Sequence, residues 1–307
     1  MQRRNFIKNT ILAAGAISLS TFDTRAAVPF AKDKPFYPEN HAAPLKKSIM
    51  WETIGTKGSV LEKCQAVKAA GFQGVEPSSH MDRKEMIAAL KATGLEASSV
   101  CNAKHWSLPL SHPDAKVRQE GIDAMIVAME DAVAYGTDAV LLVPGVVSAE
   151  VGYEDCWKRS SECIDRLLPV AKKLKVKMCL ENVWNNFILS PMEAKMYIDQ
   201  FKSPYVRMYF DCGNILVYGW PEQWIHTLGD RVGRIHIKEF SKQKADKEGR
   251  WTGFSAKLTE GDVDWKKVMT EIRNNYTGGW LTTEQGGADS PEGLKDLCSR
   301  LDKIMNI

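Results

Sequence analysis

The stretch Val176–Asn182 reads V-K-M-C-L-E-N and decides the fold. Small and apolar residues alternate along it, which predicts a buried β-strand that ends on an acidic residue, Glu181. Burying an unpaired charge costs several kcal/mol, so a core strand gains nothing from such an ending. A carboxylate at this position therefore indicates a partner of opposite charge.

Three later stretches repeat the pattern of an apolar strand with an ionisable group at or near its end. They are V-R-M-Y-F-D at 206–211, ending on Asp211; G-R-I-H-I-K at 233–238, containing His236; and W-L-T-T-E at 280–284, ending on Glu284. Four such strands in sequence are hard to explain unless their side chains converge on one cation. Three carboxylates and one imidazole suit one divalent ion, Mn²⁺ or Mg²⁺ before Co²⁺ or Zn²⁺.

The chain from residue 46 onward alternates between strand and helix patterns. We expect strands at 47–52, 74–77, 95–103, 139–143, 176–182, 206–211, 233–238 and 280–284, and helices at 60–70, 83–93, 114–135, 154–174, 191–201, 221–228, 265–274 and 291–304. Eight strand–helix repeats in about 260 residues are typical of the α/β (β/α)₈ TIM barrel. No G-x-G-x-x-G follows a strand, which disfavours an open doubly wound sheet. The sequence therefore predicts a single barrel domain over residues 46–307, with its functional face at the carboxyl ends of the strands.

The basic character of the chain lies at its N-terminus. The 307 residues carry 41 basic and 38 acidic side chains, but residues 1–26 hold four of the basic and one of the acidic groups. The remaining 37 and 37 balance, so nothing indicates a nucleic-acid partner.

Residues 1–26 have the parts of an export signal: a charged start, a short apolar run at 11–19 and small residues before Ala27. The pair Arg3-Arg4, followed by Phe6 and Lys8, resembles the twin-arginine type and predicts a periplasmic location. The apolar run is too short to be a permanent membrane span. An uncleaved N-terminal tether is the alternative. Residues 27–45 carry four prolines and predict an extended lead-in segment.

Seven cysteines form an odd set without a C-x-x-C pair. Several occupy apolar positions of predicted strands and helices, and free cysteine is among the most buried residue types. We therefore expect core packing rather than a disulfide framework.

Motifs at the strand ends resemble those of the xylose isomerase-like barrels, a superfamily of sugar and sugar-phosphate isomerases and epimerases that also holds hydroxypyruvate isomerase and inosose dehydratase. The motifs are E-N-V-W-N at 181–185, Y-F-D-C-G-N at 209–214, H-I-K-E-F at 236–240, E-G-D-V-D-W at 260–265 and T-T-E-Q at 282–285. The resemblance covers about residues 46–305. It implies metal ligands at Glu181, Asp211, His236 and Glu284, and a catalytic proton-transfer role for Glu181 and Glu284.

Two positions depart from the ketose epimerases of that superfamily. Those enzymes carry a second acid six residues after the first ligand, where this chain has Phe187, and often a histidine three residues after the aspartate, where it has Asn214. The substrate-binding shell therefore differs, and their substrates do not transfer directly.

Candidates for substrate contact follow from position near the strand ends. They are Glu76, His105, Trp184, Asn185, Asn214 and Lys238. Lys238 lies two residues after His236 and should point the same way along the strand. The long segment 239–263, with Trp251 and Phe254, predicts a loop that acts as a lid with aromatic contacts to a sugar ring.

The combined features favour an exported, metal-dependent isomerase or epimerase that forms an enediolate from a keto-sugar or sugar derivative. Export argues against a phosphorylated substrate. A lyase that acts on 3-keto-glycosides by β-elimination and a non-catalytic exported sugar-binding protein are the alternatives. The expected partner is a small carbohydrate, and the sequence leaves a homo-oligomer open.

Overall fold

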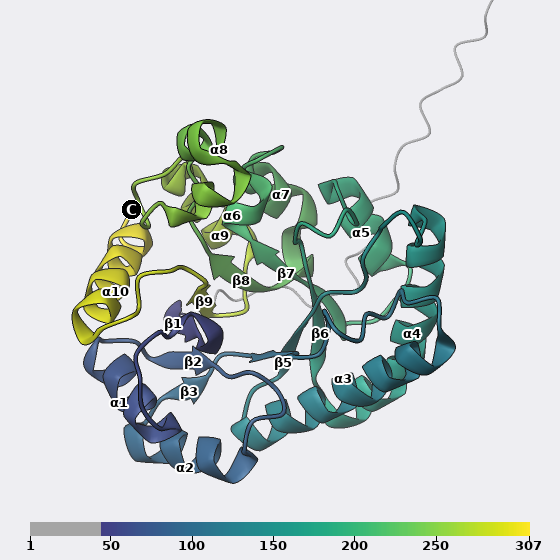
Figure 1. Ribbon diagram of the computed structural model, residues 1–307, viewed down its shortest axis with the longest axis horizontal. Coiled ribbons are helices and arrows are strands. Elements are labelled where there is room, and N and C mark those ends of the chain that lie inside the picture. The colour runs from purple at the N-terminus through teal and green to yellow at the C-terminus, as the bar shows by residue number, and fades with distance from the viewer. Residues whose placement is uncertain (1–43) are drawn as a thin grey trace, which may run out of the picture. The chain divides into compact units, whose positions relative to one another are not determined.

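The computed structural model describes residues 44–307, which include the whole predicted barrel (Figure 1). The predicted export signal at 1–26, and residues 27–43 of the predicted lead-in, lie outside the described residues. In the described part of the chain, no helix is long and apolar enough to cross a membrane.

Parallel strands form one nearly closed sheet. The strands are β1 (Lys46–Met50), β2 (Gly74–Glu76), β3 (Glu96–Ala97), β4 (Val100–Cys101), β5 (Ala139–Leu142), β6 (Lys177–Glu181), β7 (Val206–Asp211), β8 (Val232–Ile237) and β9 (Trp280–Thr283). Their order is β3-β2-β1-β9-β8-β7-β6-β5-β4, so the first and last strands of the chain pair with each other. The predicted TIM barrel is confirmed.

Helices surround the strands on the outside, as Figure 1 shows. The α-helices of the described residues are α1 (Val60–Ala69), α2 (Arg83–Thr93), α3 (Ala115–Tyr135), α4 (Tyr153–Leu174), α5 (Pro191–Asp199), α6 (Cys212–Ile215), α7 (Pro221–Leu228), α8 (Lys242–Glu248), α9 (Trp265–Asn275) and α10 (Pro291–Met305). Local chemistry sets their ends: Ser190 caps α5 by accepting from the backbone of Glu193, and Gly94 ends α2 in the left-handed conformation.

The alternation along β6 separates two packed layers. Met178 and Leu180 belong to the large cluster between strands and helices, whereas Cys179 packs with Leu141 and Tyr209 in a second cluster inside the barrel. Glu181 shares the inward parity of Cys179, so the same period of two that fills the core also aims the carboxylate at the barrel axis. All seven cysteines are buried and unpaired, as expected.

The third predicted strand, 95–103, is divided into β3 and β4 by Ser98 and Ser99. The carbonyl oxygen of Ser98 accepts hydrogen bonds from Arg234 Nε (2.7 Å) and Thr137 Oγ1 (3.0 Å). Two side chains distant in sequence thus supply hydrogen bonds to the Ser98 carbonyl where the pairing between strands stops. The prediction of one continuous strand was wrong. The first strand also ends early, at Met50, because residues 51–53 form a 3₁₀ turn.

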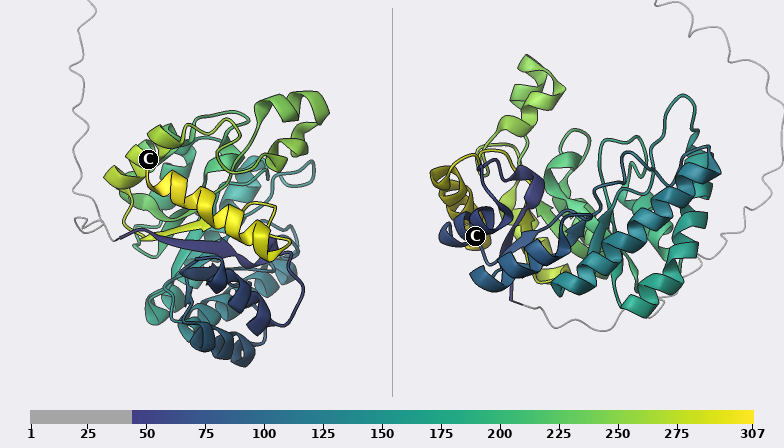
Figure 2. Two further views of the ribbon diagram at one scale, coloured as in Figure 1. Left: turned by 90° about the vertical axis from the view of Figure 1, so that its left-hand side faces the viewer. Right: turned by 60° about the horizontal axis from the view of Figure 1, so that its bottom comes forward.

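The segment 239–263 is more ordered than the predicted loop. It contains α8 and a 3₁₀ helix, Arg250–Ser255, which together we call the rim segment (residues 242–255). Figure 2 shows the rim segment standing out from one end of the barrel. The predicted loop therefore contains short helices, and its role as a lid stays a prediction. Trp251 and Phe254 do reach the candidate site described next.

Candidate active site

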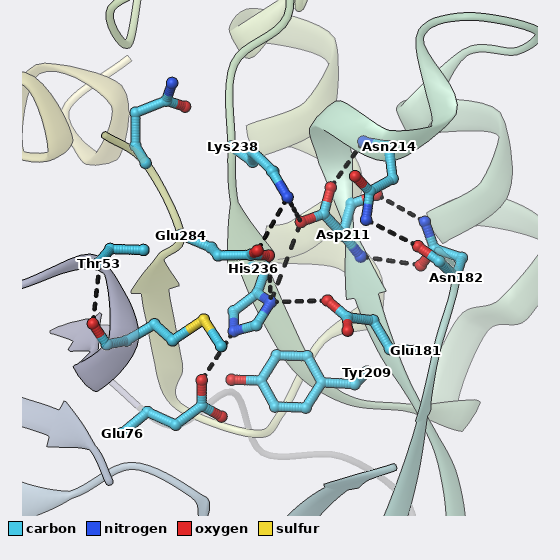
Figure 3. Close-up of polar contacts among 12 residues, drawn as sticks. Thr53, Glu76, Glu181, Asn182, Tyr209, Asp211, Asn214, His236, Lys238 and Glu284 are labelled. Atoms are coloured by element: carbon cyan, nitrogen blue, oxygen red, sulfur yellow. Dashed lines mark hydrogen bonds and ion pairs between the residues drawn. The ribbon is translucent and has the colours of Figure 1, made fainter. Parts of the chain in front are cut away.

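Glu181, Asp211, His236 and Glu284 converge at the carboxyl ends of four neighbouring strands (Figure 3). One potential ligand atom from each lies within 4.8 Å of the others. Strand register produces this convergence, since Asp211 pairs directly with His236 across β7 and β8, and Glu181 pairs with Tyr209 across β6 and β7. We call these four residues the ligand cluster.

His236 lies between opposing carboxylates. Its Nδ1 is 2.9 Å from Glu181 Oε1 and 3.2 Å from Glu284 Oε2, while Nε2 is 2.9 Å from Glu76 Oε2. Burial alone would lower the pKa of His236, but Glu76 and the other carboxylates raise it well above its usual range. A cation in the cluster would take the place of the Nδ1 proton and bind the Nδ1 lone pair, while Nε2 would keep its proton and donate it to Glu76.

The carboxylates of the cluster fit a bound cation. Asp211 is fully buried, and its Oδ2 is a buried oxygen that accepts no hydrogen bond from any described residue. Burial raises the pKa of Asp211 well above its usual range and also raises that of Glu181, which shows how poorly the surroundings compensate these charges. A divalent ion would supply the missing compensation, and three carboxylates with one imidazole are suitable ligands for Mn²⁺ or Mg²⁺.

Two asparagines that flank the cluster hold the strand ends together. Asn182 accepts from the backbone N–H of Asp211 and donates to its carbonyl oxygen, both at 2.9 Å. Asn214 donates to the carbonyl of Asn182 at 2.9 Å, and its own N–H donates to Asp211 Oδ1 at 2.7 Å. Asn182 was not predicted from the sequence, although its position directly after a strand-end ligand was a usable signal.

A cavity of about 360 Å³ opens above the ligand cluster. Its lining includes Glu181 and Glu284 together with Met50, Cys101, His105, Trp106, Val183, Trp184, Asn214, Lys238, Trp251 and Phe254. Four of the six predicted substrate contacts therefore border the cavity. They are His105, Trp184, Asn214 and Lys238.

Glu76 and Asn185 do not line this cavity. Glu76 is fully buried beneath His236, and Ser99 Oγ donates to it at 2.7 Å, so it orients a predicted metal ligand rather than facing the cavity. Asn185 is buried in the loop after β6, where it donates to the carbonyl of Gly145 at 2.7 Å and accepts from the backbone of Phe187. The sequence placed both residues at the correct strand ends, but it could not show which way their side chains turn.

Lys238 and His105 both border the cavity, but Lys238 pairs with a carboxylate and His105 does not. Lys238 Nζ is 2.9 Å from Glu284 Oε1 and 4.7 Å from the centre of the Phe254 ring. Burial on its own lowers the pKa of the two bases, Lys238 and His105. For Glu284 burial acts to raise the pKa, but Lys238 and His236 outweigh it and hold that pKa below its usual range. His105 has no such partner: burial lowers its pKa to about 4, and its Nδ1 has no hydrogen-bond partner among the described residues.

The family match comes from the barrel itself. Residues 64–304 match the model of the xylose isomerase-like TIM barrel family. The chain belongs to this family. The resemblance of the strand-end motifs is thereby confirmed over most of the region in which it was predicted.

Curated relatives in the family carry epimerase names. A protein of Haemophilus influenzae named putative L-ribulose-5-phosphate 3-epimerase is 24% identical over 252 residues, covering 77% of this chain and 84% of that protein. An L-ribulose-5-phosphate 3-epimerase of Escherichia coli K12 is 24% identical over 238 residues, covering 72% and 80%.

Solved structures share the fold. A 3-keto-D-glucoside 4-epimerase from E. coli superimposes with a TM-score of 0.71 at 17% identity, over 86% of this chain and all of that one. A D-psicose 3-epimerase from Clostridium cellulolyticum H10, solved with D-tagatose, gives 0.72 at 15% identity, over 86% and 99%.

The two departures from the ketose epimerases have different places in the structure. Phe187 is buried in an aromatic cluster, with its ring 5.2 Å from Tyr153 and 5.4 Å from Tyr197, and it does not line the cavity. Asn214 does line the cavity, where its side chain is held by Asn182. An acid at position 187 would therefore require a different loop after β6.

The segment beyond β8 is anchored by two residues that were not predicted from the sequence, Glu239 and Gln285. The buried Glu239 carboxylate accepts from the backbone of Thr259 (2.9 Å) and from Trp265 Nε1 (2.8 Å). Gln285 accepts from the backbone of Glu239 and donates to the carbonyl of Phe254, at 2.7 and 2.8 Å. Their signal was their place directly after Lys238 and Glu284, but nothing in the sequence shows that they turn away from the cavity.

Proposed function

We propose that this protein is a metal-dependent sugar epimerase or isomerase acting on an unphosphorylated keto-sugar or sugar derivative. The observation that carries the proposal is the placement of Glu181 and Glu284 at one cavity, on strands separated by β7 and β8, with His236 between them. The epimerase names of the curated relatives support the same class of reaction.

The chemistry follows from these two carboxylates. A divalent ion held by the ligand cluster would polarise a carbonyl and its neighbouring hydroxyl and favour the enediolate that forms when a proton leaves the carbon between them. Glu181 and Glu284 border the cavity from different strands. One can remove the proton and the other return it to the opposite face, which inverts the centre; a single base returning it to the neighbouring carbon would move the carbonyl instead.

The curated relatives are named for a phosphorylated sugar, and the cavity lining indicates whether a phosphate would fit here. The basic side chains that line it are Lys238 and His105. Lys238 already pairs with Glu284, and burial disfavours the charged form of His105. A phosphate prefers the Arg guanidinium fork, unpaired Lys ammonium groups and backbone N–H groups, so this lining favours an uncharged sugar.

Solvent isotope exchange tests the proposal. Purified protein supplied with Mn²⁺ or Mg²⁺ is incubated in deuterated water with keto-sugars and with 3-keto-glycosides, and the recovered sugars are analysed by mass spectrometry and NMR. Deuterium in a recovered sugar together with a new epimer or isomer is the expected result. Release of the aglycone would instead identify a lyase, and absence of exchange with metal bound would identify a binding protein.

We also propose export by the twin-arginine route, on the evidence of Arg3-Arg4, Phe6 and Lys8 alone. Replacing both arginines by lysine should leave the protein in the cytoplasm of a bacterial host. Unchanged recovery from the periplasm would contradict this proposal without affecting the proposed reaction.

A further inference from the structure

The outer part of the cavity is bordered by ring faces. Trp184 has its ring centre 4.5 Å from that of Trp251 and 4.9 Å from that of Phe254, and Trp106 borders the same cavity. These side chains come from three separate segments, after β4, after β6 and after β8. We call the four residues the aromatic wall.

Two indoles of the aromatic wall are unusually exposed. Trp106 is 53% exposed and Trp251 is 70% exposed, although both border a cavity whose floor is buried. Large exposed apolar side chains gathered at one mouth indicate a contact surface, because covering them with another apolar face is favourable. A single monosaccharide held at the ligand cluster would give these outer indoles little cover.

Polar and charged groups near the aromatic wall already have partners. Trp184 Nε1 donates to the carbonyl of Asn214 at 2.9 Å, and the Arg250 guanidinium lies 4.2 Å from the centre of the Trp184 ring. Lys238 Nζ lies over Phe254 and pairs with Glu284. The exposed indoles of Trp106 and Trp251 therefore offer ring faces to a ligand, and such faces select flat apolar surfaces such as the C–H face of a sugar or an aromatic ring.

We propose that the aromatic wall is a second subsite, which takes an uncharged ring attached to the reacting keto-sugar. This inference rests on the proposed function for the identity of the inner sugar. The inner ring lies at Glu181 and Glu284, and its substituent extends outward between Trp106 and Trp251. The preferred substrate is therefore a glycoside or oligosaccharide derivative, with a sugar ring or an aryl group as the substituent, and not a free or phosphorylated ketose.

A binding experiment tests the subsite without requiring turnover. Methyl β-D-glucoside, phenyl β-D-glucoside, cellobiose and glucose 6-phosphate share one glucose ring and differ in what is attached to it. Titration calorimetry on the full chain with metal present should show tighter binding of phenyl glucoside, cellobiose or both than of methyl glucoside, by about two- to tenfold per indole contacted. Phenyl glucoside against cellobiose distinguishes an aryl substituent from a second sugar.

Single tryptophan variants locate the effect. Trp251→Ala and Trp106→Ala should each lose most of the preference for the ring-bearing probes. Trp220→Ala is the matched control, because Trp220 is 56% exposed but does not line the cavity, and it should keep the preference. Thermal melting of each variant checks that the fold is retained.

The subsite would be overturned by no binding of the ring-bearing probes up to their solubility, by equal binding of all probes, or by a preference that survives in both wall variants. Tighter binding of glucose 6-phosphate would do the same. Isotope exchange separates this inference from the proposed function. Exchange into a keto-sugar without a ring preference rejects the subsite alone, whereas a ring preference without exchange rejects the reaction alone.

Discussion

The ligand cluster and the aromatic wall border one cavity but are held in different ways. The cluster stands on β6, β7, β8 and the end of β9, where neighbouring strands fix the position of each residue through the ladder. The wall stands on connections between strands and helices, and its outer indoles are more than half exposed. Strand register thus supplies fixed geometry for chemistry, while the connections supply a surface that sequence change can alter without disturbing the barrel.

Removal of a residue of the ligand cluster should have the largest effect of the changes considered, namely loss of the bound metal ion. We expect about one divalent ion per chain in the wild-type protein, and its loss in Asp211→Ala and His236→Ala, since each variant removes one ligand from a buried set. Elemental analysis of protein purified without chelators measures this. Trp251→Ala is the control from the wall and should retain the ion. Full metal occupancy in both cluster variants would show that the ion, if any, is bound elsewhere.

Changing the two glutamates to glutamine separates ligand from base. Glu181→Gln and Glu284→Gln each keep one oxygen ligand and remove the base, so turnover should fall by about 10²–10⁴-fold while metal affinity falls much less. Steady-state rates, measured alongside metal titration, report the two effects separately.

The pattern between the two variants identifies the reaction. In a two-base epimerase, each variant should still exchange the proton of one epimer with solvent while failing to convert it. Near-normal conversion by one variant would make that residue a ligand only and indicate a one-base isomerisation. Near-normal conversion by both would place the catalytic base elsewhere.

Glu76 should have a smaller effect, through His236. Its carboxylate accepts from His236 Nε2 and from Ser99, so Glu76→Gln weakens the orientation of the imidazole without removing a ligand. Metal affinity should fall by about 10–100-fold. Saturating metal should restore most of the turnover. A lower melting temperature with unchanged metal affinity would show that Glu76 serves the fold only.

The sequence predicts the floor of the site better than its rim for a physical reason. The period of two along β6 fixes both the burial of Leu180 and the inward direction of Glu181, so one local pattern gives fold and ligand together. The break at Ser98 depends instead on Arg234, which lies 136 positions away in the chain. A contact of that kind leaves no local trace in the sequence.

The structure of the rim segment could not be predicted from the sequence, because it depends on which polar side chains turn inward and bind its backbone. Glu239 and Gln285 follow cavity residues directly, yet their side chains bind the segment that carries Phe254. This bonding orders residues that otherwise read as a long loop. The sequence correctly placed Trp251 and Phe254 near the site, but the anchors of this segment depend on the tertiary fold.

His105 combines features of both regions, since it follows β4 in a connection yet is only 7% exposed. Burial lowers its pKa to about 4, below the ordinary 6.5, while the charge of Glu284 acts in the opposite direction. The unfolded chain therefore binds more protons than the folded one between these two values. The contribution of His105 to the free energy of unfolding is fully present above about pH 6.5 and is lost as the pH falls toward 4.

This loss gives the smallest of the expected effects and tests whether the cavity wall is dry at His105. Between pH 7 and pH 5, the wild-type protein should lose about 2 kcal/mol more unfolding free energy than His105→Gln, which cannot take up the proton. Urea unfolding with a chelator present measures the difference without a contribution from metal release. His226→Gln is the matched control for removing an imidazole, because the His226 side chain is 75% exposed and lies away from the cavity lining. Equal losses in the wild type and His105→Gln would mean that water reaches the imidazole, so that the cavity is wet rather than dry at His105.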